Sequence, residues 1–141
     1  MKDAEPLLLD THVWYWLVSG HEKLAEAALI RRLERAAVEG RLHLSVISIW
    51  EIAMLEAKGR LSLGRRCESW VEEAMEKSHV RLAHLDPAIA ILSTRLQGFA
   101  YGDPADRILA ATVLEKGWTL ATADQRLIDY LKSQKMPVLA L

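Results

Sequence analysis

Leu7-Leu8-Leu9-Asp10, followed directly by Thr11, is the stretch of this sequence that most constrains the fold. Three consecutive leucines are typical of a short strand that is buried on both faces, as in a parallel sheet. Thr11 can cap a short helix that runs through about residue 17 and closes at Gly20. A buried strand that leads straight into a helix is the repeating unit of an α/β protein. Asp10 gains little from packing at this junction, so it is the first candidate functional residue.

The rest of the chain alternates between strand and helix patterns in the same way. We expect strands at residues 42–46, 80–82, 118–122 and 138–139, and helices at residues 21–39, 48–59, 65–77, 86–96, 105–116 and 125–131. Short strands that alternate with helices predict a parallel sheet with helices on both faces. No internal repeat, low-complexity tract or linker interrupts the pattern, so we expect residues 1–141 to form a single domain.

The composition is that of a folded protein in a reducing compartment. Of 141 residues, 51% are hydrophobic and 26% are charged. No apolar run approaches the ~20 residues that span a bilayer, and the acidic start at residues 1–6 is not typical of a signal peptide. Cys67 is the single cysteine, so an internal disulfide is excluded and the cytoplasm is the expected location.

The net charge of -1 gives the chain no overall attraction to nucleic acid. Any contact with nucleic acid therefore needs a local basic patch, for which Arg60, Arg65 and Arg66 are candidates, although such a stretch is more often a solvated face.

Three further segments carry carboxylates at junctions similar to that of Asp10. Ser48-Ile49-Trp50-Glu51 has the form of a capping box, which predicts a helix start at Ser48 with Glu51 in its first turn. Asp103-Pro104-Ala105-Asp106 opens another helix, and Asp124 follows the strand at 118–122. Each acid also has a purely structural explanation, because Glu51, Asp103, Asp106 and Asp124 all occupy positions suited to helix capping.

Four of these acids, Asp10, Glu51, Asp106 and Asp124, together indicate a metal site. The carboxyl ends of parallel strands lie at one edge of a sheet, where functional crevices form. Carboxylates that converge there repel one another unless a cation joins them, and oxygen-only sites suit hard divalent cations that promote phosphate ester hydrolysis. No glycine-rich phosphate loop, zinc-type Cys/His spacing or Gly-x-Ser-x-Gly motif offers other chemistry.

The aromatic residues near these acids have mostly structural interpretations. His12 follows Asp10 by two residues, but a lone histidine near a helix start is more often structural or exposed than a ligand. Five tryptophans are expected in the core or at an interface rather than as platforms for stacking bases: Trp14, Trp16, Trp50, Trp70 and Trp118.

Read in order, these segments resemble the PIN-domain nucleases, in particular the VapC-like toxins of type II toxin–antitoxin systems. The resemblance covers almost the whole chain. It is carried by residues 8–12 (LLDTH), 48–53 (SIWEIA), 58–61 (KGRL), 102–111 (GDPADRILAA) and 120–124 (LATAD). It implies a three-layer α/β/α sandwich with a short central parallel sheet.

The resemblance also implies a function. The catalytic and metal-binding tetrad would be Asp10, Glu51, Asp106 and Asp124, with Thr122 at the family's Ser/Thr place near the last acid. The implied cofactor is Mg²⁺ or Mn²⁺, and the implied reaction is endonucleolytic cleavage of an RNA substrate. A cytoplasmic homodimer that a cognate antitoxin neutralises, with no membrane partner, completes the expectation. The family pattern gives Asp103 no firm role.

Other functions remain open from the sequence. A housekeeping RNA-processing PIN nuclease would use the same residues, and a catalytically inactive PIN-like domain would only bind RNA or protein. An aspartyl phosphatase of the haloacid-dehalogenase kind also begins with a strand-terminal aspartate. It normally has a second aspartate two residues later, where this chain has His12, so we discount this class.

Overall fold

The computed structural model describes residues 4–100 and 102–141; the first three residues of the acidic start, and Tyr101, lie outside it. Within these residues the strands form one parallel five-stranded sheet in the order β3-β2-β1-β4-β5. The strands are β1 (Leu7–Leu9), β2 (Leu42–Ser45), β3 (Arg81–Ala83), β4 (Thr119–Thr122) and β5 (Val138–Ala140). The order reverses between β1 and β4, which is the place where parallel α/β sheets form their functional crevice.

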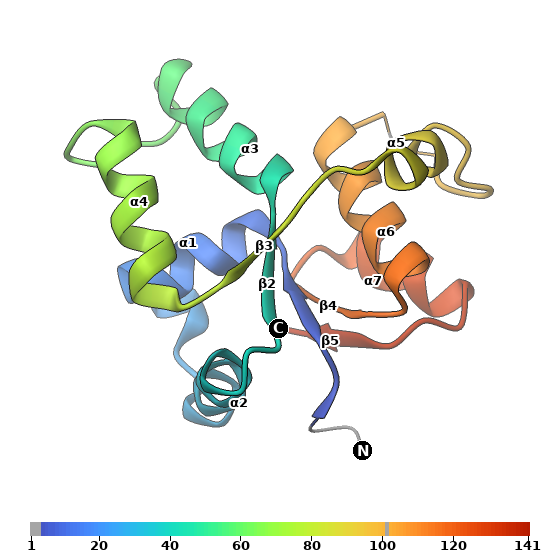
Figure 1. Cartoon of the computed structure of the whole chain (residues 1–141), viewed down its shortest axis with the longest axis horizontal. Helices are drawn as coiled ribbons and strands as arrows, with labels where there is room; N and C mark the ends of the chain where they lie inside the picture. Colours follow the sequence, from blue (N-terminus) through green and yellow to red (C-terminus); the bar gives the residue numbers. More distant parts are fainter. Residues whose placement is uncertain (1–3, 101) are drawn as a thin grey trace.

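Helices cover both faces of the sheet, as Figure 1 shows. On one face lie α1 (Thr11–Ser19), α2 (Ala27–Val38), α3 (Val46–Ala57) and α4 (Cys67–Ser78), with a 3-10 turn at Glu22–Leu24. On the other face lie α5 (Pro87–Ser93), α6 (Pro104–Lys116) and α7 (Gln125–Ser133). The expected three-layer α/β/α sandwich is therefore confirmed. No helix within the described part of the chain is long and apolar enough to cross a membrane.

The leucines of β1 divide between the two layers. Leu7 and Leu9 pack with the helices of the first face, whereas Leu8 packs with α6 and α7 on the second. Alternate residues of a strand point to opposite faces, so a central strand needs apolar side chains at every position. All three leucines are at most 1% exposed, and β1 lies between β2 and β4 in the sheet.

The capping box expected at Ser48 is wrong. Helix α3 begins at Val46, and its cap is Ser45, whose hydroxyl accepts a hydrogen bond from the Ile47 amide at 3.1 Å. Ser48 is fully buried inside the first turn, where its hydroxyl accepts a hydrogen bond from Thr11 at 2.8 Å. Glu51 consequently lies in the second turn and not the first, so a capping role does not explain it.

The helix expected at residues 21–39 is also wrong in one respect, because it is interrupted. His21 caps the 3-10 turn by accepting a hydrogen bond from the Lys23 amide, and Glu26 then has extended backbone angles before α2 begins. At the start of α1 the cap position is Asp10 and not Thr11. The remaining elements lie within a few residues of their expected ends.

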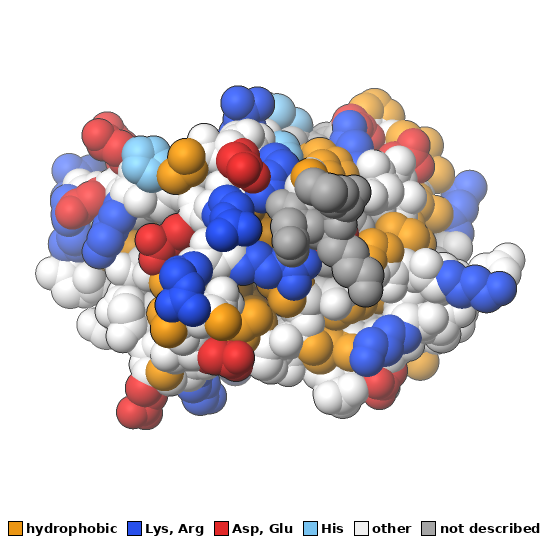
Figure 2. Space-filling view, turned by 90° about the horizontal axis from the view of Figure 1, so that it is seen from below, with side chains coloured by type: hydrophobic (Ala, Val, Ile, Leu, Met, Phe, Trp, Pro, Cys, Tyr) orange, Lys and Arg blue, Asp and Glu red, His pale blue; other side chains and the backbone are white. Residues whose placement is uncertain are grey.

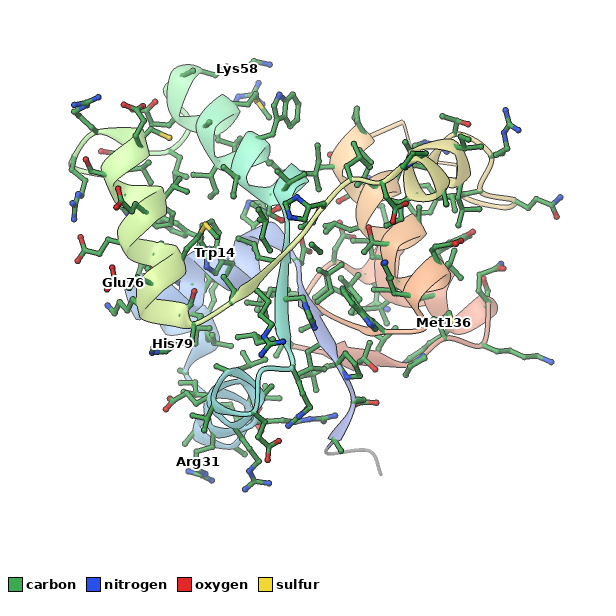
Figure 3. The ribbon with its side chains drawn as sticks, viewed as in Figure 1. Trp14, Arg31, Lys58, Glu76, His79 and Met136 are labelled. Atoms are coloured by element: carbon green, nitrogen blue, oxygen red, sulfur yellow. The ribbon has the colours of Figure 1, made fainter. Side chains whose placement is uncertain are left out.

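Trp14 ties α1 to α4 inside the first layer (Figure 3). It is fully buried, its Nε1 donates a hydrogen bond to Ser78 Oγ at 3.1 Å, and its ring meets Trp70 edge to face at 5.4 Å. The expected core position is confirmed for Trp14. Trp50, in contrast, is 50% exposed on α3.

These two tryptophans make a matched test of the packing. Trp14→Ala removes a buried ring and leaves a cavity, so it should lower the free energy of unfolding by about 3 to 5 kcal/mol. Trp50→Ala, at an exposed site, should change it by less than about 1 kcal/mol. Urea unfolding followed by far-UV circular dichroism measures both. Equal losses for the two variants would contradict the packing described for α1 and α4.

Candidate functional site

A pocket of about 300 Å³ lies at the carboxyl ends of the central strands. Its lining brings together residues from the β1–α1 junction, α1, α3, the start of α6, the β4–α7 junction and α7. They are Asp10, His12, Trp16, Glu51, Asp103, Asp106, Ala123, Asp124 and Arg126. The structure thus gathers all four acids singled out in the sequence around one cavity, although they are up to 114 residues apart (124 − 10) in the chain. Their roles in catalysis stay predictions.

Asp10 is held in place by the end of the neighbouring strand. Its amide donates to the Ala121 carbonyl at 2.9 Å, and its Oδ2 accepts a hydrogen bond from the Thr122 hydroxyl at 2.6 Å. Burial raises the pKa of Asp10 above its ordinary value, and the Thr122 hydrogen bond opposes that rise. Thr122 therefore orients the Asp10 carboxylate and stabilises its charged form.

Asp124 combines a capping role with a place in the pocket. Its amide donates to Thr122 Oγ1 at 3.0 Å, and its Oδ1 accepts the Arg126 amide at 2.9 Å, so it caps α7 as its position suggested. Thr122 thereby links two of the acids through one hydroxyl, donating to Asp10 and accepting from the backbone of Asp124.

Asp106 lies in the first turn of α6 and is 9% exposed. Burial raises the pKa of Asp106 to about 7, and four neighbouring carboxylates add to the effect: Asp103, Asp10, Asp124 and Glu51. The Arg126 guanidinium approaches Asp106 Oδ2 only to 3.7 Å and is half exposed, so it offsets little of this repulsion. The pocket thus holds more negative charge than its own side chains balance.

Glu51 enters the pocket from the second turn of α3. Burial raises its pKa above the ordinary value; hydrogen bonding with Thr11 opposes the rise, and the charges of Asp10 and Asp103 add to it. The Thr11 hydroxyl also lies 2.8 Å from Ser48 Oγ, so one hydroxyl at the start of α1 fixes α3 beside the end of β1. This contact sets where Glu51 stands relative to Asp10.

Asp103 lines the same pocket but serves as the cap of α6. Its Oδ1 accepts hydrogen bonds from the amides of Ala105 at 2.9 Å and Asp106 at 3.4 Å. The cap role expected from Asp103-Pro104 is confirmed. The cap also positions Asp106, because the two residues share one helical turn.

The donor set fits a hard divalent cation in its chemistry. The pocket offers carboxylate oxygens from four separate segments, and burial raises the pKa of both Asp10 and Asp106 above the ordinary value. As these side chains stand, no group of three or more acidic, histidine or cysteine residues in the described segments is arranged to hold a metal ion. Arg126 takes part in this arrangement, because its guanidinium lies 3.3 Å from Asp124 Oδ2 and 3.7 Å from Asp106 Oδ2.

Arg126 and Trp16 are the lining residues that sequence reasoning missed. Arg126 follows the cap residue Asp124 by two positions, a spacing that lets a side chain return to its own cap, and this signal was available in the sequence. Trp16 lies one helical turn after His12, and their rings are 6.2 Å apart. His12 is exposed at the pocket, as expected.

The basic stretch singled out in the sequence lies outside this pocket. Arg65 pairs with Glu73, and Arg66 pairs with Glu68 at 2.7 Å. These two arginines form a solvated and locally neutralised face.

Comparison with known proteins agrees with this architecture. The chain is 37% identical over 121 residues to ribonuclease VapC22 of Mycobacterium tuberculosis. The matched segment covers 86% of this chain and 88% of that protein. The fold is also similar to two solved structures. One is DNA-bound VapBC from Salmonella typhimurium, with a TM-score of 0.67 at 16% identity, covering 95% of this chain and 96% of the other. The second is VapBC2 from Rickettsia felis bound to a DNA fragment from their promoter, with a TM-score of 0.66 at 14% identity, covering 96% and 98%.

Residues 7–132 match the PIN domain family over most of the length of the chain. Strands β1 to β4 and the residues that line the acidic pocket lie within the matched segment. The chain therefore belongs to the PIN domain family.

Proposed function

We propose that this chain is a divalent-metal-dependent endoribonuclease that acts as the toxin of a type II toxin–antitoxin pair. The observation that carries the proposal is the convergence of Asp10, Glu51, Asp106 and Asp124 on one pocket at the carboxyl ends of parallel strands. The Mycobacterium tuberculosis relative, named a ribonuclease, supports the reaction. The VapBC complexes of similar fold support a protein partner.

The residues have distinct parts in this proposal. Asp10, Asp106 and Asp124 would hold the cation, Mg²⁺ or Mn²⁺, through their carboxylate oxygens. When bound, such a cation supplies Lewis acidity toward water and phosphate oxygens. Thr122 keeps Asp10 oriented through the 2.6 Å hydrogen bond, and Asp103 holds the first turn of α6 so that Asp106 faces the pocket. The Arg126 guanidinium would leave its present place beside Asp106 and Asp124.

Glu51 has the position for handling water. Its carboxylate reaches the pocket from a separate helix, and its pKa lies above the ordinary value because of burial. A carboxylate with a raised pKa accepts a proton more readily near neutral pH, so Glu51 would orient the attacking water or take its proton, or contribute to a second cation. The attack on phosphorus needs no protein nucleophile.

The partner has a candidate surface of its own. A second concavity of about 300 Å³ lies between α1, α2 and α4, and its lining is mainly apolar. The lining includes Leu17, Val18, Leu33, Ala37, Val38 and Leu42, and Val38 is 87% exposed. An exposed apolar groove suits the apolar face of a helical segment, so the proposal places a segment of the antitoxin here. The homodimer and the cytoplasmic location belong to the proposal through the family resemblance.

The function is tested by Asp10→Asn. This variant keeps the size of the side chain but removes charge, so it should fold and should lose RNA cleavage by at least about a hundredfold, and excess EDTA should do the same to the wild type. RNA ends are sequenced after brief induction of each form, alone and together with the product of any small reading frame that neighbours its gene. Undiminished cleavage by purified wild type in EDTA contradicts the metal-dependent reaction. Normal growth despite soluble wild-type protein contradicts the toxin role and leaves the housekeeping nuclease.

The raised pKa of Asp106 makes metal-free stability depend on pH. The folded state keeps a proton that the unfolded chain releases near pH 4, so wild-type stability in EDTA should fall as pH rises from about 4 to above 7. Asp106→Asn removes this loss. In EDTA at pH 8 it should be more stable than wild type by about 2 to 4 kcal/mol, with little difference near pH 4, where the unfolded chain also keeps the proton. Thermal unfolding measures the stability of the wild type and of the variant at each pH. Equal or lower stability of the variant at pH 8 would show that Asp106 is not repelled by the other carboxylates of the pocket.

Substitutions that keep or remove the helix cap distinguish the role of Asp103 from that of Asp106. Asparagine caps helices about as well as aspartate, so Asp103→Asn should leave stability and RNA cleavage nearly unchanged, whereas Asp103→Ala should cost about 1 kcal/mol and keep most activity. Asp106→Asn should instead lose cleavage while remaining folded. If Asp103→Asn keeps its melting temperature but loses cleavage as fully as Asp106→Asn, then Asp103 belongs to the cation site.

A further inference from the structure

Arginines gather at the end of the sheet opposite to the acidic pocket. A hollow of about 160 Å³ is lined by Arg31, Arg32 and Arg35 of α2, together with Arg41 and Ala28. Arg41 directly precedes β2, and the acidic pocket lies at the other, carboxyl ends of the strands. Figure 2 views the molecule from the side of α2, and Lys and Arg side chains gather near the middle of that face.

A fifth arginine adds to this surface. Arg81, at the start of β3, packs so closely on Gly40 that a Cβ atom there would lie 2.6 Å from its Nη2. Gly40 also has a φ of 71°, so the turn itself favours glycine. Burial lowers the pKa of His43, and the positive charge of Arg81 lowers it further. We call Arg31, Arg32, Arg35, Arg41 and Arg81 the arginine surface.

Two members of the arginine surface have a structural task. Arg32 pairs with Glu5 at 2.7 Å, and Arg41 donates to the Glu5 carbonyl at 2.6 Å and pairs with Glu39 at 2.5 Å. These contacts fasten the segment before β1 onto α2. These contacts give Arg32 and Arg41 a structural role that needs no bound ligand.

Arg31 and Arg35 have no such task. Both are exposed, one helical turn apart on α2, and neither has a carboxylate partner among residues 4–100 and 102–141. Figure 3 shows Arg31 pointing away from the body of the molecule. Like charges four residues apart destabilise a helix slightly, so this pair is a cost to folding that an anionic ligand would remove.

We infer that the arginine surface binds phosphate groups of an RNA strand whose scissile bond lies at the acidic pocket, and this inference rests on the proposed function. Guanidinium groups match phosphate oxygens with two parallel hydrogen bonds. A protein partner is less suited to this hollow, because interfaces between proteins need an apolar centre and the lining here is four arginines and one alanine. The apolar concavity between α1, α2 and α4 is the surface that fits a protein.

The position of the surface predicts which RNAs use it. It lies at least the length of the sheet away from the acids, which for the four residues of β2 is about 13 Å, before the flanking loops and helices are added. Only an RNA long enough to pass from one end of the molecule to the other contacts both sites. Arg31 and Arg35 thus determine affinity for long substrates and leave the chemistry at the pocket untouched.

The test uses Arg31→Ala with Arg35→Ala in the whole chain, and Arg65→Ala with Arg66→Ala as the matched control. Binding of labelled poly(U) is measured in the Asp10→Asn background between about 50 and about 200 mM salt. Loss of two phosphate contacts should weaken binding roughly tenfold or more near 0.1 M salt and reduce the salt slope by about 1.4. The control should bind as the parent does. Cleavage is measured with Asp10 intact. There, Arg31→Ala with Arg35→Ala should cleave a tetranucleotide substrate as the wild type does, while its KM for a long RNA should rise at constant kcat.

Each contrary result has a separate meaning. Unchanged affinity and salt slope for poly(U) would overturn the inference, and so would an equal loss in the control pair. Loss of binding to poly-L-glutamate without loss of poly(U) binding would assign the surface to an acidic protein instead. If the wild type binds poly(U) through these arginines but cleaves no RNA, then the proposed function fails while the RNA-binding surface stands.

Discussion

The carboxyl end of β1 is the fixed point on which the site is built. β1 has a strand on each side and helices on both faces, so its three leucines are buried and its register with β2 and β4 is set from both edges. Asp10 therefore leaves the sheet at a defined place, beside the end of β4. A shift of β1 by one residue would exchange Leu7 and Leu9 with Leu8 between the two layers and move Asp10 away from Thr122.

The cost of this arrangement is electrostatic. Several carboxylates face one pocket of about 300 Å³, and the pKa of Asp106 rises to about 7 because of burial and its acidic neighbours. Hydrogen bonds from Thr122 to Asp10 and from the α6 and α7 backbones to Asp103 and Asp124 offset part of the strain. The half-exposed Arg126 guanidinium adds little more. The cation of the proposed function would supply the positive charge that this pocket lacks.

A net charge of -1 does not show how the charges are distributed over the molecule. Negative charge collects at the carboxyl ends of the strands, and arginines collect at the amino ends, around α2 and the start of β3. The net charge of a chain says nothing about this separation of acidic and basic side chains. The separation arises only when α2 folds back beside the starts of β1 and β2. For a nuclease, this division would let one end of the molecule hold an RNA strand while the other end acts on it.

The sequence by itself determined the alternation of strands and helices, the central buried strand and the junctions that carry Asp10, Asp106 and Asp124. Those features depend on local chemistry: runs of leucine, Pro104 after a capping aspartate, and glycine at helix ends. Tertiary structure decided what depends on distant contacts. Both Ser45 and Ser48 can cap a helix, and Ser48 lost that role because Thr11, 37 residues away, buries and bonds its hydroxyl. That contact placed Glu51 in the second turn of α3. Likewise, the strand order, the return of Arg126 to the acids and the gathering of arginines from α2, Arg41 and β3 follow from packing between segments that no local pattern links, so only the folded chain reveals them.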